Sequence, residues 1–319
     1  MELETPPQSI SISEKFKYDG NGTELAFVMF KNLLFTVLTF GIYAAWARTN
    51  TRRYLWGKTS FFGDRTTYTG QGKELFKGWL IVSGIYLLFA ISVNVLQQFI
   101  NPIFAVLIVP IYMYIYAIIL YGGTRYRVSK TTWRGIRFGV DKDKAMTRDF
   151  LKIVFKYSFL SLITFGIASP LLIHETRKFL TNRMRLGSSY FRYEADRREF
   201  CILCYKGVLL TIITLGFYLP WFHAKLIQFR LEKTKIQNAG FKVHLLGKDL
   251  FLYSLASFIL GIVTLGLATP WILNWGNKLI INSIELSGEV DFQTIENLAS
   301  DGEATADVAA VEYDIDLAF

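Results

Sequence analysis

Thr214-Leu215-Gly216-Phe217-Tyr218-Leu219-Pro220-Trp221 is the most informative stretch of this chain, because close copies of it occur three more times. The copies begin at Thr39, Thr164 and Thr264, and the last three of the four are 50 residues apart. An acid followed by Leu or Phe stands fifteen residues before each threonine. Self-similarity at a fixed period indicates a repeat architecture. The chain therefore divides into about five related units, which start near residues 18, 68, 140, 193 and 243.

Each unit begins with a short aromatic segment and a turn, and the acid follows. The acid lies where a helix is expected to begin, at the positive end of its dipole. The segments are rich in strand formers and in aromatic residues that suit a membrane interface, so they predict short interfacial strands. Four of them are Phe16-Lys17-Tyr18, Thr66-Thr67-Tyr68, Phe191-Arg192-Tyr193 and Phe241-Lys242-Val243.

The repeated Thr-x-Gly sequence interrupts an apolar run. Glycine commonly ends a helix, and proline four positions later suits the first turn of a new one, so the motif predicts a break or kink inside the membrane. Three interpretations stay open: a bent span without activity, a discontinuous helix that binds an ion or solute near the midplane, and an interfacial hairpin that enters one leaflet. The motif residues are Thr39, Gly41, Thr164, Gly166, Pro170, Thr214, Gly216, Pro220, Thr264, Gly266 and Pro270.

The composition is that of an integral membrane protein. Apolar residues make up 52% of the 319 positions, and the 47 positions from 78 to 124 carry no charged side chain, which is membrane length. The net charge of +9 hides a basic body, because residues 279–319 hold ten acids and no Lys or Arg. The basic clusters flank apolar runs, so they indicate the cytoplasmic membrane surface and anionic headgroups as partner, not nucleic acid. Protein partners are not identifiable from the sequence.

Span counting favours an all-α integral membrane protein with about six kinked or broken transmembrane helices built from the 50-residue repeats. Two of the spans are expected at 79–100 and 103–121, around an outside turn at Asn101-Pro102. Strict alternation breaks the positive-inside rule once, at the basic loop 174–199. Hairpins remove that violation, but each arm has only about eight apolar residues, roughly 12 Å, which is too short to cross.

Three segments are expected along the chain: a polar N-terminal segment at 1–14, a repeated multi-pass membrane domain at 15–292 and a flexible acidic tail at 293–319. The tail has no run able to span, so its removal should leave membrane insertion intact. The first residues lack a charged-then-apolar leader, and no cleaved signal peptide is expected.

Lys31, Lys156 and Lys206 are the candidate functional positions. Each lies eight residues before a motif threonine and seven after the acid, and the last copy has Ala256 there instead. An ionisable group within a span must reach water, a headgroup or a partner. The lysines therefore either extend to headgroups or line a shared path for an anionic solute or lipid.

Other candidate sites are weaker. Cys201 and Cys204 have the spacing of half a metal site, but there is no second pair and the three histidines are scattered, so buried thiols are the better interpretation. The chain has no nucleophile elbow, phosphate loop or zinc-protease motif. We therefore expect no catalysis, cofactor or metal. The leading function is binding or moving a solute or lipid. The alternatives are a structural or partner-binding membrane component, and a membrane enzyme acting on a lipid-like substrate.

The motif at 214–221, the Tyr18-x-Gly-x-Gly-x-Glu24-Leu25 sequence and the Arg52-Arg53-Tyr54 run together resemble the YjgN-like family of bacterial inner-membrane proteins, a family of unknown function. The resemblance covers roughly residues 15–292. It implies a location in the bacterial inner membrane and supplies no catalytic residues, cofactor or substrate. The chain departs from the family pattern where Ala45 replaces Pro, Leu171 replaces Trp, and Ala168 and Ala268 replace Tyr.

Overall fold

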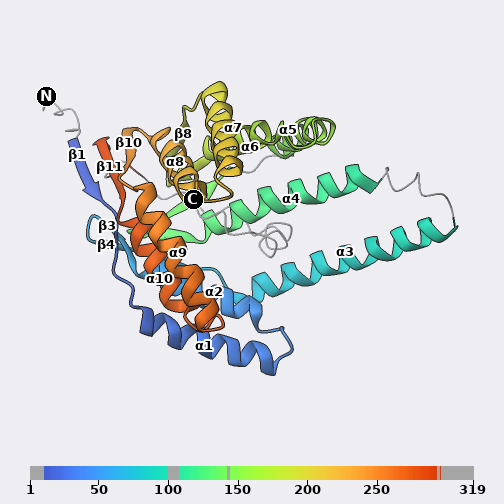
Figure 1. Ribbon diagram of the computed structural model, residues 1–319, viewed down its shortest axis with the longest axis horizontal. Coiled ribbons are helices and arrows are strands. Elements are labelled where there is room, and N and C mark those ends of the chain that lie inside the picture. The colour runs from blue at the N-terminus through green and yellow to red at the C-terminus, as the bar shows by residue number, and fades with distance from the viewer. Residues whose placement is uncertain (1–10, 100–107, 142–143, 293–294, 296–319) are drawn as a thin grey trace, which may run out of the picture.

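The computed structural model describes residues 11–99, 108–141, 144–292 and 295 (Figure 1). Its helices are α1 (Gly22–Leu38), α2 (Ala44–Gly57), α3 (Gly72–Phe99), α4 (Ile108–Ser129), α5 (Lys144–Ile163), α6 (Ser169–Thr181), α7 (Arg197–Ile213), α8 (Leu219–Glu232), α9 (Gly247–Val263) and α10 (Thr269–Ile281). Its strands are β1 (Ser11–Lys15), β2 (Lys17–Tyr18), β3 (Thr59–Phe61), β4 (Asp64–Tyr68), β5 (Thr131–Trp133), β6 (Ile136–Val140), β7 (Met184–Leu186), β8 (Ser189–Tyr193), β9 (Thr234–Ile236), β10 (Asn238–Val243) and β11 (Ile284–Glu289).

The strands form a single sheet that closes on itself, which we call the strand ring. Within the described residues it has eleven strands in the order β1-β11-β10-β9-β8-β7-β6-β5-β4-β3-β2. The two outermost strands, β1 and β2, are successive segments of one stretch: β1 pairs with β11 and β2 pairs with β3. Between them, the Phe16 N–H donates to the Ile284 carbonyl at 2.9 Å. The N-terminal stretch therefore links the two edges of the sheet, which leaves few unpaired backbone groups.

All the helices leave the ring from one rim. Each of the pairs β3–β4, β5–β6, β7–β8 and β9–β10 is antiparallel and joined by a turn of two residues, such as Phe62-Gly63 between the paired Phe61 and Asp64. Both central residues of that turn have positive φ, at 52° and 78°, as a tight hairpin turn requires. The other end of every strand pair connects to helices. The ring thus has a turn rim and a helix rim.

The Thr-x-Gly motif forms the tip of a helical hairpin. In α1–α2, the Thr39 hydroxyl donates to the Phe35 carbonyl at 2.7 Å and accepts from the Tyr43 N–H at 3.0 Å, so it bridges the end of one helix and the start of the next. Phe40 and Gly41 follow in the left-handed region, at φ 50° and 92°, where the chain reverses. Thr164, Thr214 and Thr264 make the same pair of bonds in α5–α6, α7–α8 and α9–α10.

The predicted fold class is therefore wrong. The protein is not all-α with about six kinked or broken transmembrane helices, because the motif reverses the chain and returns it to the strand ring. Within the described residues, only Gly72–Asn94 of α3 is long and apolar enough to cross a membrane. The predicted turn at 101–102 lies outside the described residues, and α4 begins at Ile108. The aromatic segments do lie in strands, namely β2, β4, β8 and β10, but these belong to the ring and are not separate interfacial pieces.

At three of the five places where neighbouring hairpins meet in the described part of the chain, a tryptophan packs on a glycine. A Cβ added at Gly72 would lie 2.5 Å from Cδ1 of Trp46, and one at Gly247 would lie 2.2 Å from Cδ1 of Trp221. The same contact closes the circle, since Trp271 from α10 packs on Gly22 at the start of α1. Each glycine opens the first helix of a hairpin and each tryptophan lies in the second helix of the preceding one. These tryptophan–glycine contacts hold neighbouring hairpins together.

Gly247→Ala is expected to destabilise the protein by about 2 kcal/mol, because the new methyl group overlaps the Trp221 indole and overpacking costs about 1–3 kcal/mol. Gly261→Ala, in the same helix, is the matched control. Nothing lies within 4 Å of its added Cβ, so the alanine should stabilise α9 slightly. Thermal unfolding of the purified protein in detergent measures both. Equal melting temperatures for the two variants would contradict the contact.

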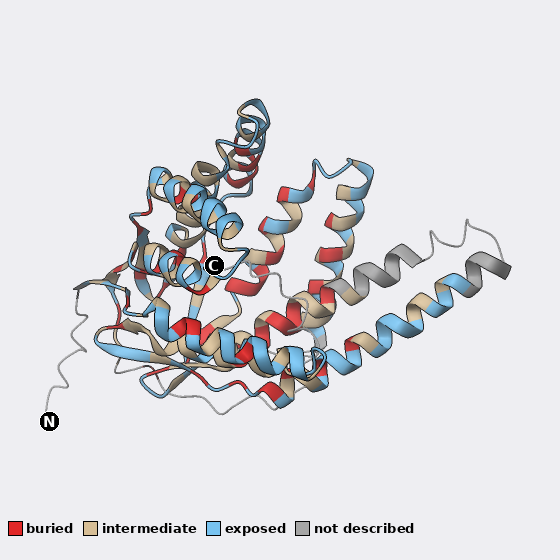
Figure 2. Ribbon diagram, turned by 60° about the horizontal axis from the view of Figure 1, so that its bottom comes forward, coloured by how far each residue is buried: buried red, intermediate tan, exposed pale blue. Residues whose placement is uncertain are grey.

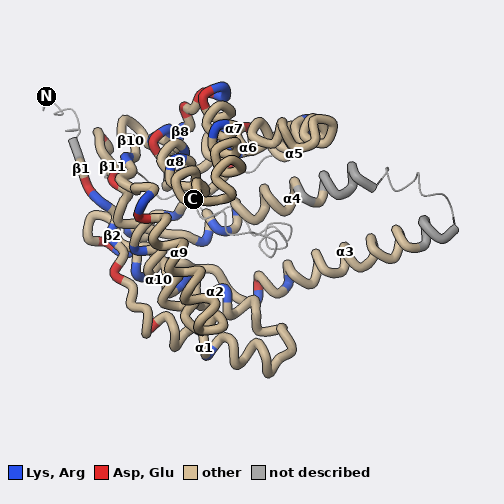
Figure 3. The backbone as a smooth tube through the Cα atoms, viewed as in Figure 1, with Lys and Arg blue, Asp and Glu red and all other residues tan. Residues whose placement is uncertain are grey.

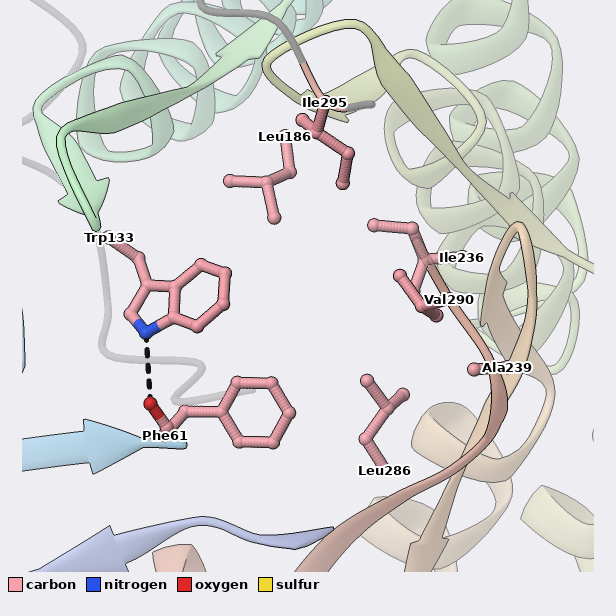
Figure 4. Close-up of a cluster of buried hydrophobic side chains, with 8 residues drawn as sticks. All are labelled: Phe61, Trp133, Leu186, Ile236, Ala239, Leu286, Val290 and Ile295. Atoms are coloured by element: carbon pink, nitrogen blue, oxygen red, sulfur yellow. Dashed lines mark hydrogen bonds between the residues drawn. The ribbon is translucent and has the colours of Figure 1, made fainter. Parts of the chain in front are cut away.

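The interior of the ring is a hydrophobic cluster to which every second strand contributes. Phe61, Trp133, Leu186, Ile236 and Leu286 come from β3, β5, β7, β9 and β11, and the Trp133 indole N–H donates to the Phe61 carbonyl at 3.1 Å (Figure 4). Val290 and Ile295, which follow β11, are buried in the same cluster, and Phe292 packs against it. The residues after β11 therefore close the ring interior, and Ile295 lies three positions beyond the predicted domain boundary at 292.

The hairpins have an unusual surface. Their outer parts are exposed although they are apolar, whereas buried residues concentrate near the ring (Figure 2). The extreme cases are the left-handed tip residues, of which Phe40 is 98% exposed and Phe165 96%; Leu215 and Leu265 are 90% and 91% exposed. Lysine, arginine and acid side chains gather near the ring, and the outer parts of the helices carry few (Figure 3). An exposed apolar area of this extent indicates contact with an apolar phase.

Candidate functional site

The strongest candidate site is a cavity where one tryptophan–glycine contact is missing. Leu171 of α6 occupies the position of the tryptophan, and Arg197, the first residue of α7, occupies the position of the glycine. A cavity of about 570 Å³ lies here, which we call the α6–α7 groove. Its lining residues are Leu171, His174, Glu175, Lys178, Ala195, Asp196, Arg197, Arg198, Cys201 and Tyr205.

The charged residues of the groove lie at its ring end. Arg197 Nε donates to Glu175 Oε1 at 2.7 Å, and Asp196 caps α7 by accepting from the Glu199 N–H at 2.9 Å. Both acids are thus engaged. Lys178 and Arg198 are exposed and have no ion pair with any described residue. Two cations are therefore available to a ligand at this end.

The tip end of the groove is less polar. Leu171 lies just after the hairpin tip, and the Tyr205 hydroxyl is used in a hydrogen bond to the Ile167 carbonyl, at 3.0 Å. The groove therefore has a cationic end toward the strand ring and a more apolar end toward the tips. That polarity matches an anionic amphiphile, whose charge and hydrocarbon lie at opposite ends.

His174 and Cys201 form the inner wall, and Cys204 is buried one turn further along α7. His174 is 1% exposed and its Nδ1 has no hydrogen-bond partner among the described residues, while burial lowers its pKa, so the ring is neutral at pH 7. Burial also raises the pKa of the Cys204 thiol to about 11, and that of Cys201 in the same direction. Thiols of that kind are unreactive. In the described part of the chain, no three His, Cys, Asp or Glu residues are grouped to hold a metal.

The predicted lysines lie on three different hairpins: Lys31 on α1, Lys156 on α5 and Lys206 on α7. Lys31 lines a second hollow of about 400 Å³ with Asn32, Asn50 and Arg53, and Lys156 Nζ lies 5.3 Å from the centre of the Tyr157 ring. Neither of the two cavities described here is lined by more than one of these lysines. Their shared role as a ring around one path stays a prediction. The motif residues are likewise divided among four separate tips.

Sequence reasoning missed the groove, although its signal was present. The replacement of the motif tryptophan by Leu171 was visible, but its partner could not be found without the fold. The contact joins one unit to the next. Arg197, which stands where the partner glycine would be, therefore lies 26 positions further along the chain than Leu171.

The chain matches the family described as "Bacterial protein of unknown function (DUF898)" over residues 13–209 and 207–311. The chain belongs to this family. Relatives named "Inner membrane protein YjgN" include those of Escherichia coli strain K12, 25% identical over 126 residues, and Salmonella typhimurium strain LT2, 26% identical over 122 residues. The resemblance to YjgN-like proteins is thereby confirmed.

These matches are partial. They cover 40% and 38% of this chain, and only 31% and 30% of the respective relatives. No solved structure matches the chain. The names of the relatives support a bacterial inner-membrane location and specify no activity for the family.

Proposed function

We propose that the protein is held in the bacterial inner membrane by its helical hairpins and binds an anionic amphiphile, the chemistry of a phospholipid, in the α6–α7 groove. The observation that carries the proposal is the polarity of the groove, with Lys178 and Arg198 available at one end and Leu171 at the other. The role is one of binding, and no catalytic step is part of it.

The depth of the hairpins supports this arrangement. Lys31, Lys156 and Lys206 each lie nine residues before a left-handed tip residue, which is about 13 Å along a helix. Half of a bilayer's hydrocarbon core is about 15 Å thick. With the lysines at headgroup level, the four tips reach close to the bilayer centre and do not cross it. The proposal thus adopts the hairpin interpretation of the repeats and the headgroup interpretation of the lysines.

The same arrangement satisfies the positive-inside rule. Each short hairpin returns to the side from which it entered, so the ring and every basic loop, including 174–199, remain on the cytoplasmic side. The 28-residue α3 is about 42 Å long and the 22-residue α4 about 33 Å, so these two helices are long enough to cross and return. The multi-pass part of the protein is then this pair alone.

The groove lies at the right level for a headgroup. Tyr205, on its wall, directly precedes Lys206, which marks the headgroup level on α7. Lys178 and Arg198 are nearer the ring, on the aqueous side of that level. A phospholipid with its phosphate between these cations would extend its acyl chains toward the tips. A charge-assisted hydrogen bond from each cation contributes about 1.5–3 kcal/mol.

Rebuilding the missing contact tests the proposal. The double variant Leu171→Trp, Arg197→Gly restores the pair found at Trp221 and Gly247, so it should keep or raise the melting temperature while the indole fills the groove. Anionic phospholipid retained by the detergent-purified protein, measured by native mass spectrometry, should fall about tenfold, the change that 1.4 kcal/mol produces.

Lys178→Gln with Arg198→Gln is the companion variant, because it removes the free cations and leaves the groove open. It should also lose anionic lipid and keep zwitterionic lipid. Wild-type retention of anionic lipid by both variants would reject the groove as a lipid site. That outcome would instead favour a structural membrane component.

A further inference from the structure

A second feature lies beneath the groove: a group of polar atoms that are buried without partners. Nine buried side-chain nitrogen or oxygen atoms lack a hydrogen-bond partner within the described residues. Four of the nine belong to residues around the end of β8, between α6 and α8. They are His174 Nδ1, Arg177 Nε, Tyr193 Oη and Arg230 Nε.

Tyr193 is the centre of this group. Its ring centroid lies 5.9 Å from that of His174, and the guanidinium carbon of Arg177 lies 5.9 Å from it on another side. Against the larger effect of burial, the positive charges of Arg177 and Arg230 both lower the pKa of the Tyr193 hydroxyl, and that hydroxyl raises the pKa of each arginine. The four side chains therefore lie close together, and His174 also lines the α6–α7 groove.

Both arginines keep their charge there. Burial and the neighbouring Arg230 lower the pKa of Arg177 to about 10, which is still well above neutral pH. Neither guanidinium has a hydrogen bond or ion pair with any described residue. The nearby acids are occupied elsewhere: Glu175 binds Arg197 at 2.7 Å and Glu199 binds Lys233 at 3.0 Å.

The pair is not a requirement of the repeated architecture. Arg177 lies thirteen residues after its motif threonine, a position held by Arg52, Ile227 and Asn277 in the other short hairpins. Arg230 lies sixteen residues after its own, where the others have Leu55, Leu180 and Ile280. Among the four short hairpins, α6 followed by α8 is the one successive pair with arginine at both positions. Arg52 and Tyr68, the counterparts of Arg177 and Tyr193, also have buried atoms without a partner among the described residues.

Buried donors without an acceptor are unfavourable, and the Nε atom of each of these half-buried arginines is such a donor. Arginine can only donate, and the Tyr193 hydroxyl and a neutral His174 protonated on Nδ1 can donate as well. Four neighbouring donors without acceptors match a ligand that accepts hydrogen bonds and carries negative charge. We propose that Arg177, Arg230, Tyr193 and His174 form an anion site for a phosphate-class oxyanion, either free in solution or as the headgroup of a lipid in the groove.

The test uses the full-length protein purified in detergent, and its readout is the melting temperature. Inorganic phosphate should raise it by about 5 °C over chloride at equal ionic strength, because a ligand of the folded state stabilises that state. Arg177→Met with Arg230→Met should abolish this rise. Without phosphate, the double variant should melt at or above the wild-type temperature, since it removes two buried donors that have no acceptor.

Two further measurements keep the outcome decisive. If the double Met variant does not fold, Arg230→Gln should lower phosphate affinity about tenfold in titration calorimetry, and Arg192→Gln, at an exposed position of β8, should leave it unchanged. If only nanodiscs with anionic lipid stabilise the wild type, and the Met variant loses that effect, the oxyanion is a headgroup. The site is rejected if neither phosphate nor anionic lipid stabilises the wild type more than the Met variant. If lipid retention depends on Lys178 and Arg198 but not on Arg177 and Arg230, the anion site is rejected and the lipid-binding groove is retained.

Discussion

Aspartate at all four hairpin tips is expected to reduce the amount of folded protein in the membrane fraction more than tenfold. The variant carries Phe40→Asp, Phe165→Asp, Leu215→Asp and Leu265→Asp. At the depth inferred from the lysines, each carboxylate would lie near the bilayer centre. Aspartate there costs about 2.5–3.5 kcal/mol on insertion scales, so four of them cost about 10–14 kcal/mol.

The direction of the change in stability shows whether the hairpin tips lie in lipid or in water. All four positions have left-handed backbone, with φ between 49° and 50°. Aspartate adopts that conformation more readily than Phe or Leu. If the tips were in water, the variant would therefore be as stable as the wild type or more so. The loss is expected only if the tips lie in hydrocarbon.

Two control variants accompany the measurement. Exchanging the tip residues, Phe to Leu and Leu to Phe, should leave membrane abundance unchanged, because it alters shape and not polarity. Replacing Lys31, Lys156 and Lys206 by Gln should also be tolerated if these side chains only reach headgroups. Impaired binding of anionic lipid by a folded triple Gln variant would instead support a lysine-lined path. Wild-type abundance of the four-aspartate variant would reject insertion of the tips.

The local chemistry of the repeats was predictable from the sequence, but their direction was not. Thr39, Gly41 and the equivalent residues indicated that a helix ends and another begins, and they do so in the structure. The reversal requires positive φ at both Phe40 and Gly41, and non-glycine residues such as Phe40 rarely adopt positive φ. Ordinary preferences therefore favoured a kinked span, and tertiary structure selected the hairpin.

The strand ring was not predicted from the sequence, for a different reason. Among the described residues, four of the five strands that directly follow a helical hairpin are only three residues long, as in Thr59–Phe61 and Met184–Leu186, and such segments carry little periodic signal. Closure depends on β1 meeting β11, which pairs Ser11 with Glu289 across almost the whole chain. The groove depends on Leu171 and Arg197 from successive units. Long-range pairings of this kind are set by the fold, and the candidate site could not be located before it was known.

Ending the chain after Glu289 is expected to abolish accumulation of folded protein, whereas ending it after Ile295 should leave abundance near wild type. The shorter protein lacks Val290, Phe292 and Ile295, which close the ring interior. Burial of an apolar side chain contributes about 1.5–3 kcal/mol, so removing the three costs about 5 kcal/mol, a large part of the stability of an ordinary domain.

Hydrogen bonds and aromatic contacts make the closing segment specific. The Asp291 N–H donates to Gln237 Oε1 at 2.9 Å, and Phe292 packs edge-on against Trp133 with ring centroids 5.0 Å apart. Ending the chain at 292, the predicted boundary, removes Ile295 alone from this set and should cost about a third as much.

Membrane-fraction abundance and the detergent melting temperature measure the effect of these truncations. A full-length variant with Ser at positions 290, 292 and 295 keeps the acidic tail, so it should fail like the shortest chain if apolar closure of the ring is the cause. Wild-type melting of that variant would show instead that the ring is stable without the segment.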